Sequence, residues 1–153
     1  NLIEHCSPIN IGTVVLEGAL LVSIVIVFNQ SNFYADGIAK CDRIILRGVS
    51  HSSISNGKLK VAGDTSESVD AISLQDQNSN HCTDNLFTNL YMGRVGGAAS
   101  NRFAYGIEEK DANQNYNTYG ILNGRDCVTA ALRKLGANSK YLATLIQGSV
   151  ATS

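Results

Sequence analysis

The chain has 153 residues, and its 12 Lys or Arg against 13 Asp or Glu give a formal net charge of −1. This balance, with Lys and Arg scattered along the chain, gives no indication of electrostatic capture of nucleic acid, and no nucleic-acid partner is expected. Hydrophobic residues make up 44% of the chain. That share and this length are typical of one globular domain with a buried core.

The N-terminal part is the most apolar. The chain begins with Asn1 and lacks a signal-peptide pattern, which indicates a processed chain or a piece of a longer one. Residues 9–28 form the most apolar stretch, Glu17 interrupts it, and the uncharged part from residue 18 to 28 is too short to span a bilayer. We expect a buried helix at about 13–21 and a strand at 22–28. Membrane contact through residues 9–28 is the alternative.

Turn signals and apolar runs divide the middle of the chain into short elements. Asn56–Gly57 is the preferred dipeptide of a type I′ hairpin turn, which predicts an antiparallel hairpin over residues 50–64. Other strands are expected at residues 43–49, 69–75 and 102–108, a short helix or strand at 85–95, and a polar loop at 109–120. No internal repeat is evident.

The segment NGRDCVTAALRKLG, residues 123–136, has the pattern of a helix. Asp126 suits the N-cap, and Gly136 suits the position after the last turn. One helical face would carry Val128, Ala131, Leu132 and Leu135. A second helix is expected at about 139–147. Strands followed by helices predict an α+β fold, with an antiparallel sheet packed against this helix.

Cys127 would lie in the first turn of that helix. There the helix dipole and the free backbone N–H groups favour the thiolate, which is the reactive form. A nucleophilic cysteine also needs a neighbouring base. Of the three histidines, His51 opens the first strand of the expected hairpin, whereas His5 lies near the N-terminus and His81 in a polar loop. The alternative is an inert or disulfide-bonded Cys127.

The register of the expected hairpin suggests a partner for His51. If Asn56–Gly57 forms a two-residue loop, His51 faces Ala62 on the polar face of the hairpin. Asp64 then lies diagonal to His51, within reach of its ring. Asp64 is therefore the candidate that orients the imidazole.

The motifs SHSSIS and YNTYGILNGRDCVTAALRKLG, in this order, resemble the circularly permuted papain-like cysteine hydrolases. These include NlpC-type peptidases and the lecithin–retinol acyltransferase group, and the resemblance covers residues 43–136. It implies a papain-like fold with Cys127 as nucleophile, His51 as base and a polar residue that orients the base. Asp126 departs from the family, many members of which have Asn before the cysteine.

The resemblance also sets the expected chemistry. The Cys127 N–H would stabilise the oxyanion, with Tyr119 or Asn123 as a helper. Residues 43–153 would form the catalytic domain, and residues 1–42 an apolar segment packed on it or preceding it within one globular unit. The expected activity is that of a cysteine hydrolase or acyltransferase on an amide or ester, and it needs no cofactor.

The expected partners follow from this activity. The substrate would be a peptide, peptidoglycan or, given the apolar residues 9–28, a lipid acyl chain. An apolar leader before a papain-like domain also resembles the toxin ends of bacterial delivery systems. That resemblance implies a secreted or delivered protein, with an immunity or inhibitor protein that covers its cleft.

A different class of protein is the alternative: a secreted binding domain without enzymatic activity, held by disulfides. The four cysteines are Cys6, Cys41, Cys82 and Cys127, and three pairings exist. Cys127 would then bond Cys82 or Cys41. The cysteines form no CxxC pair and the histidines are dispersed, so no metal site is expected.

Overall fold

A computed structural model describes strand residues 2–3, 14–17, 25–27 and 32–35 and the ranges 44–61, 69–94 and 102–153. Almost all of its regular structure is short strand. The strands are β1 (Leu2–Ile3), β2 (Val14–Glu17), β3 (Val25–Val27), β4 (Asn32–Ala35), β5 (Ile44–Arg47), β6 (Ser53–Ser55), β7 (Lys58–Val61), β8 (Ile72–Gln75), β9 (Leu86–Thr88), β10 (Leu90–Arg94), β11 (Tyr105–Glu109), β12 (Thr118–Tyr119), β13 (Leu122–Asn123), β14 (Ala130–Arg133), β15 (Lys140–Tyr141), β16 (Ile146–Gln147) and β17 (Val150–Ala151). One 3-10 helix, η1 (Ala143–Leu145), completes the described elements.

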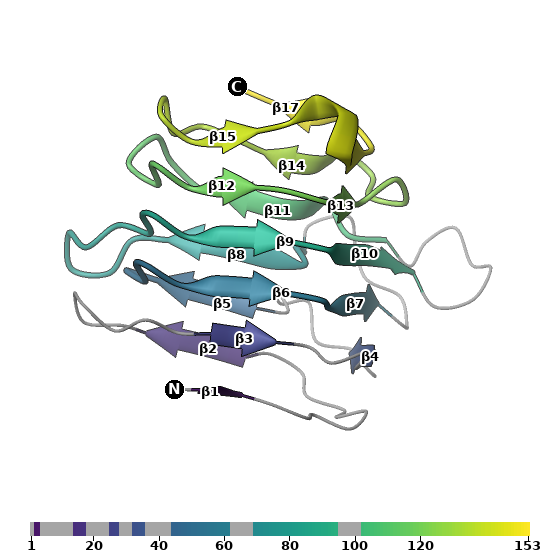
Figure 1. Ribbon diagram of the computed structural model, residues 1–153, viewed down its shortest axis with the longest axis horizontal. Helices are drawn as coiled ribbons and strands as arrows, with labels where there is room; N and C mark the ends of the chain where they lie inside the picture. The colour runs from purple at the N-terminus through teal and green to yellow at the C-terminus, as the bar shows by residue number, and fades with distance from the viewer. Residues whose placement is uncertain are drawn as a thin grey trace.

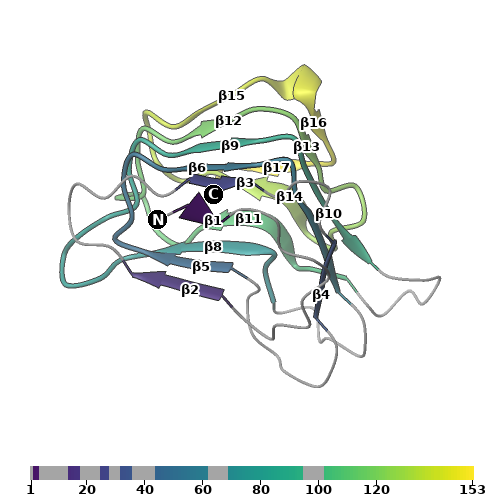
Figure 2. The same cartoon turned by 60° about the horizontal axis from the view of Figure 1, so that its bottom comes forward.

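The strands form three parallel sheets. Sheet A has the order β1-β3-β6-β9-β12-β15, sheet B the order β4-β7-β10-β13-β16, and sheet C the order β2-β5-β8-β11-β14-β17. Each strand from β2 to β14 pairs with the one three places further along the chain, and β1 pairs with β3, so from β2 onward the chain visits the three sheets in turn. Figure 1 shows the resulting stack of coils, from purple to yellow, and Figure 2 shows the coils wrapping around a shared interior. The molecule is a parallel β-helix.

The expected α+β, papain-like fold is wrong. Residues 130–133 form β14, which pairs in parallel with β11 and β17. The backbone N–H groups that a helix would use locally bond to other coils instead, as from Val128 to Phe103 O at 2.8 Å and from Ala131 to Ser149 O at 2.9 Å. Local helix propensity is a weak preference, and pairing between coils overrides it.

The hairpin at Asn56–Gly57 is also wrong, although the turn is real. Asn56 has a φ of 59°, a left-handed conformation that Asn tolerates well. However, β6 belongs to sheet A and β7 to sheet B, so the turn is a corner of the coil. The antiparallel bridge among the described residues joins Gln77 and Asn80 across the turn residues 78 and 79.

The described strands of residues 1–42 belong to the same three sheets as the rest of the chain. The helix expected at about 13–21 is wrong where the chain is described, because Val14–Glu17 is β2, whereas β3 lies inside the strand expected at 22–28. Within the described residues, no helix has the length and apolar character needed to cross a bilayer. Membrane contact through residues 9–28 stays a prediction.

The core consists of columns of like residues, because parallel in-register strands place equivalent positions above one another. One column of sheet C runs through Ile44, Ile72, Ile107, Leu132 and Val150. In sheet A, the rings of Phe87 and Tyr119 stack with centroids 5.3 Å apart and planes at 14°. Each coil therefore buries its apolar side chains mainly against the next coil.

A row of polar residues lies at the corner that leads into sheet A. It consists of Ser52, Asn85, Asn117 and Ser139, each directly before a strand of that sheet, and we call it the inner ladder. All four are at most 5% exposed. Asn85 Nδ2 donates to Asn117 Oδ1 at 3.1 Å, and the Asn117 N–H donates to Ser139 Oγ at 3.2 Å. At the corner the backbone N–H and C=O groups leave the hydrogen-bonding pattern of the sheets, and the side chains of the ladder bond to them instead.

Glu109 is buried at the end of β11 and joins the inner ladder. Its carboxyl accepts from Tyr119 Oη and Ser139 Oγ, both at 2.7 Å, and from the Leu135 and Gly136 N–H groups at 2.6 and 2.7 Å. A Cβ atom on Gly136 would lie 2.1 Å from a backbone oxygen of the neighbouring coil. Gly136 is therefore required for close approach between coils, and its expected role at a helix end is wrong.

Candidate functional site on the outer face of sheet B

Cys127 lies in the turn between β13 and β14, where its N–H donates to Gly124 O at 2.9 Å. Its Sγ lies 3.9 Å from Met92 O. Burial raises the pKa of the thiol to about 12, and the negative charges of Asp126 and Asp70 add to the shift. This environment disfavours the thiolate, whereas an activated nucleophile needs a lowered pKa.

His51 lies on an exposed corner before β6, and its side chain is 60% exposed. Its Nε2 is 4.0 Å from Asp84 Oδ2, and its N–H donates to Thr83 O. These contacts include none of the residues that contact Cys127. Asp64 lies outside the described residues, so its expected role at His51 stays a prediction.

The two expected oxyanion helpers occupy different environments. Tyr119 is 1% exposed, and burial and the charge of Glu109 raise the pKa of its hydroxyl well above its usual value. Its hydroxyl is bonded to Glu109, which leaves it unsuited to contact a substrate. Asn123 lies at the end of β13, and its Oδ1 is buried without a partner in the described part of the chain.

Cys82 and Cys127 are both free thiols, so the alternative with Cys127 in a disulfide is wrong in this structure. Cys82 is fully buried, and its Sγ donates to Leu46 O at 3.3 Å. Burial raises the pKa of Cys82 to about 11. Cys6 and Cys41 lie outside the described residues.

A groove of about 490 Å³ lies on the outer side of sheet B. Its lining consists of Asn56, Gly57, Lys58, Asn89, Leu90, Tyr91, Ile121, Asn123 and Gln147. Four of these residues stand in register on successive strands: Lys58, Tyr91, Asn123 and Gln147. We call this row the outer ladder. At the usual spacing between strands it extends for about 14 Å across four coils.

Tyr91 is held flat along its strand. A Cβ atom on Gly93 would lie 2.6 Å from Tyr91 Oη and 2.8 Å from two ring carbons, so the ring lies over this glycine. Tyr91 Oη also donates to Asp126 Oδ2 at 3.3 Å. The half-buried ring is thus a fixed aromatic element in the groove wall.

The corner beside the outer ladder supplies the other groove wall. Asn89 Nδ2 donates to Asn56 Oδ1 at 2.6 Å, and both residues have positive φ. Ile121, on the next coil, is 52% exposed. At the far end of the groove, Arg125 donates to Gln147 Oε1 at 2.7 Å. The groove thus combines amides with one aromatic residue, Tyr91, and two aliphatic residues, Leu90 and Ile121, and Lys58 lies on its most N-terminal coil.

A separate charged cluster lies on sheet C. Lys110 bonds to both Asp70 and Glu108, and Arg133 Nη1 donates to Glu108 Oε1 at 2.5 Å. Burial and a hydrogen bond with Glu108 raise the pKa of Asp70 to about 8. The Asp70 and Glu108 side chains are at most 5% exposed, so these carboxyl groups bond within the protein and do not present a surface to a ligand.

Within the described ranges, no group of three or more His, Cys, Asp and Glu side chains is placed as a metal site would require.

Asn123 was expected from the sequence, but the other three members of the outer ladder were not. For Lys58 and Tyr91 the signal is a weakly similar seven-residue stretch, SSISNGK from residue 52, NLFTNLY from 85 and NTYGILN from 117, and Gln147 has no such stretch. The seventh positions of these motifs are Lys58, Tyr91 and Asn123. Comparisons with protein-family models, curated proteins and solved structures find no match.

Proposed function

We propose that this chain is a binding segment of a β-helix protein that holds an extended polysaccharide in the groove on sheet B. The observation that carries the proposal is the outer ladder, Lys58, Tyr91, Asn123 and Gln147, in register within one groove. A row of this kind presents one side chain per coil along the axis of the β-helix. Such a surface suits a ligand that is itself a linear chain.

The chemistry of the groove favours a polysaccharide over other polymers. Amide groups and a lysine ammonium bond to hydroxyl groups, and the Tyr91 ring and Ile121 offer apolar surface to the C–H faces of sugar rings. An extended peptide usually binds by adding a strand to a sheet edge, but this groove crosses the face of a sheet.

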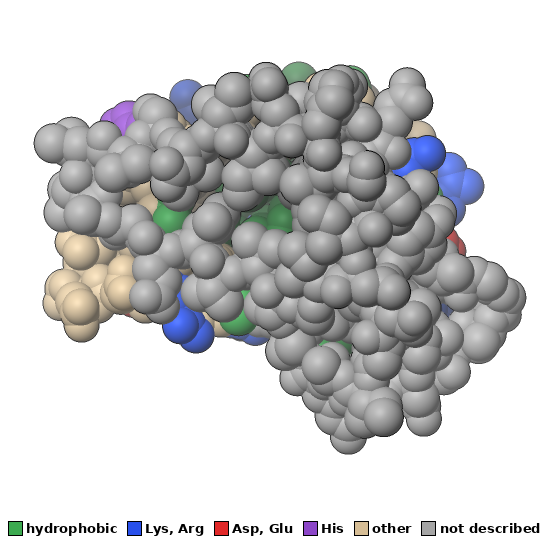
Figure 3. Space-filling view, turned by 90° about the horizontal axis from the view of Figure 1, so that it is seen from below, with side chains coloured by type: hydrophobic (Ala, Val, Ile, Leu, Met, Phe, Trp, Pro, Cys, Tyr) green, Lys and Arg blue, Asp and Glu red, His purple; other side chains and the backbone are tan. Residues whose placement is uncertain are grey.

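A polyanion such as nucleic acid fits the groove less well. Phosphate chains are bound by many cations, and the groove has Lys58 within it and Arg125 beside it. In the end-on view of Figure 3, described Lys and Arg side chains show at separate places around the edge. The ligand we propose is accordingly neutral or only weakly charged.

The test is affinity electrophoresis of the purified protein in gels that contain one soluble polysaccharide each, from neutral glucans and galactomannans to uronate polymers. We expect retardation by at least one neutral polymer, and Tyr91→Ala should abolish most of it. Tyr116→Ala is the matched control, because Tyr116 is 57% exposed and lies outside the groove. Retardation by no polymer, or equal loss in both variants, would refute the proposal.

The cysteine-hydrolase activity stays a prediction from the sequence. The raised pKa of Cys127 and the separate contacts of His51 give it no support. The expected secreted or delivered location also stays a prediction, and it agrees with a polysaccharide ligand because most long polysaccharides lie outside the cell membrane.

A further inference from the structure

A second hollow lies at the corner between sheets C and A. Its volume is about 180 Å³, and it is lined by Gly48, Ser50, Ser79, Asn80, His81 and Thr83. None of these residues lines the groove on sheet B. The hollow has room for one small ring and not for a polymer, so it is a separate site.

His81 and Asp76 form a hydrogen-bonded pair at this hollow. His81 Nδ1 lies 2.9 Å from Asp76 Oδ1. An ionised carboxylate can only accept a hydrogen bond, so the proton of the neutral imidazole is on Nδ1. Nε2 is then left as an acceptor. It has no partner among the described residues, and the ring is 37% exposed.

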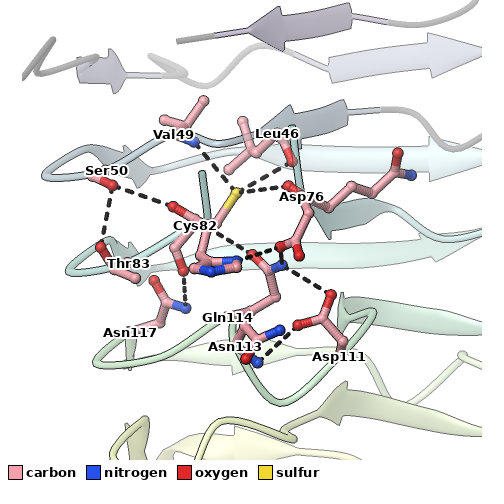
Figure 4. A network of polar contacts seen from close by, with 12 residues as sticks. Leu46, Val49, Ser50, Asp76, Cys82, Thr83, Asp111, Asn113, Gln114 and Asn117 are labelled. Atoms are coloured by element: carbon pink, nitrogen blue, oxygen red, sulfur yellow. Dashed lines mark hydrogen bonds and ion pairs between the residues drawn. The ribbon is translucent and has the colours of Figure 1, made fainter. Parts of the chain in front are cut away.

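A buried amide holds Asp76 in place. Gln114 is fully buried; its Nε2 donates to Asp76 Oδ1, and also to Asp111 Oδ2 at 3.2 Å. Its Oε1 accepts from the Cys82 N–H at 2.7 Å. Figure 4 shows Gln114 between Cys82 and Asp76, with all of these contacts drawn. The carboxylate that orients His81 is therefore anchored in the core of the β-helix.

The hydroxyl groups of Ser50 and Thr83 donate their hydrogen bonds within the protein, one to the backbone and one to the other hydroxyl. Ser50 Oγ lies 3.3 Å from His81 O, to which it donates, and 3.1 Å from Thr83 Oγ1. Because the Ser50 proton is on the carbonyl, Thr83 is the donor in the second contact. Both oxygens then retain only lone pairs, so Ser50 and Thr83 can accept hydrogen bonds from a ligand, whereas Ser79 and Asn80 in the same wall can also donate.

We propose that this hollow binds a small hydroxylated ring, a single sugar or a cyclic polyol, with His81 Nε2 accepting a hydrogen bond from one of its hydroxyl groups. Asp76 and Gln114 are positioning residues that fix the proton on Nδ1. Asp76, and Asp111 behind Gln114, are the charged groups facing the pair. This site is independent of the polysaccharide groove, so either proposal can fail without the other.

The test is ¹⁵N NMR of the imidazole nitrogens at pH 8, with methyl glycosides and myo-inositol as probes. We expect His81 to be almost wholly the Nδ1–H tautomer. His51 has no buried residue that orients its ring, and we expect it to show a mixture of the Nδ1–H and Nε2–H tautomers. At least one probe should shift the His81 Nε2 signal with saturation. Tyr91→Ala should leave this titration unchanged.

Two variants at Asp76 separate positioning from folding. Asp76→Ala should return His81 to the free mixture and weaken probe binding at least fivefold. Asp76→Asn should largely restore both, because Oδ1 of the amide can still accept from His81 and Gln114. The proposal is overturned if His81 shows the same mixture as His51 in the native protein, or if no probe shifts its signals. Loss of the effect in Asp76→Asn with an unchanged amide spectrum would remove the positioning role.

Discussion

The inner and outer ladders use similar residues for opposite purposes. Both place polar side chains at one position on successive coils, and both contain asparagine. In the inner ladder, Asn117 is fully buried. Its side-chain amide accepts a hydrogen bond from Asn85 and donates to Cys82 O and to Glu109. In the outer ladder, Asn123 lines a groove and leaves its Oδ1 without a partner in the described chain.

The comparison shows that the position of a residue within the coil determines whether its side chain points inward or outward, and that this direction determines what the side chain must do. A residue that points inward at a corner must satisfy every buried polar group, because an unpaired group there costs free energy. A residue that points outward faces that demand only at the atoms that it buries, such as Oδ1 of Asn123, and its exposed atoms are free to contact a ligand. Substitutions in the two ladders should therefore separate stability from binding.

The largest effect is expected at the acceptor of the inner ladder. Glu109→Ala leaves the Tyr119 hydroxyl and the Leu135 and Gly136 N–H groups without their acceptor, and it leaves Ser139 Oγ with only the 3.4 Å bond to Gln114 O. We expect the free energy of unfolding to fall by at least about 3 kcal/mol, since each buried unpaired group costs about 1–3 kcal/mol. Urea unfolding followed by circular dichroism measures it, with the exposed Thr118→Ala as control. A loss under about 1 kcal/mol would contradict the role of Glu109.

The alkylation rates of two cysteines, one beside each ladder, test how strongly the two regions bury their thiols. Cys82 lies beside the inner ladder with a pKa of about 11, and Cys127 lies near the outer ladder with a pKa of about 12. Only the thiolate reacts, so at pH 8 we expect both to react at least about 100-fold more slowly than in the unfolded chain. The rates should rise with pH up to these pKa values.

Mass spectrometry after timed treatment with iodoacetamide measures both rates. The unfolded protein is the internal control, because it exposes the same thiols without burial. Fast reaction of Cys127 at pH 7 would contradict its raised pKa and would restore the cysteine-hydrolase prediction.

The two asparagines offer a matched pair. Asn117→Ala removes partners of the Asn85 N–H and of Cys82 O, and we expect a loss of about 2 kcal/mol in stability. Asn123→Ala should change stability by less than about 0.5 kcal/mol and weaken polysaccharide binding. Urea unfolding and affinity electrophoresis on both variants measure the two effects. Similar losses of stability would remove the distinction between the ladders.

Part of the fold could be predicted from the sequence. Strands expected at residues 43–49, 69–75 and 102–108 coincide with β5, β8 and β11, and Asn56 does turn the chain. The pairing could not be predicted, because each strand pairs with one that is 18 to 35 residues away and the loops between the strands differ in length. Members of the inner ladder are 33, 32 and 22 residues apart, which obscures the repeat.

The candidate site was harder to predict for a related reason. The helix pattern of residues 123–136 is locally complete, and nothing within it shows that Ala130–Arg133 pairs with β11. The reactivity expected of Cys127 depended on that helix. Conversely, the seven-residue stretches that end at Lys58 and Tyr91 share little sequence, and Gln147 lies outside them, so only the register between coils shows that these residues line one groove.

The smallest effect is expected from one methyl group in the outer ladder. In Gly93→Ala, the new Cβ would overlap the end of the Tyr91 side chain, which can swing away toward solvent. We expect stability to change by less than about 1 kcal/mol, because no backbone atom is among the nearest contacts. Polysaccharide binding should nevertheless fall by about fivefold, since 1 kcal/mol corresponds to that factor.

Affinity electrophoresis of Gly93→Ala and of the double variant with Tyr91→Ala measures this effect. If Gly93 acts through the ring, the glycine substitution should have no further effect once Tyr91 is alanine. Equal losses in both backgrounds would mean that Gly93 itself contacts the polymer. The packing of the Tyr91 ring over Gly93 fixes the ring along the strand, and this fixed position distinguishes it from an ordinary exposed tyrosine.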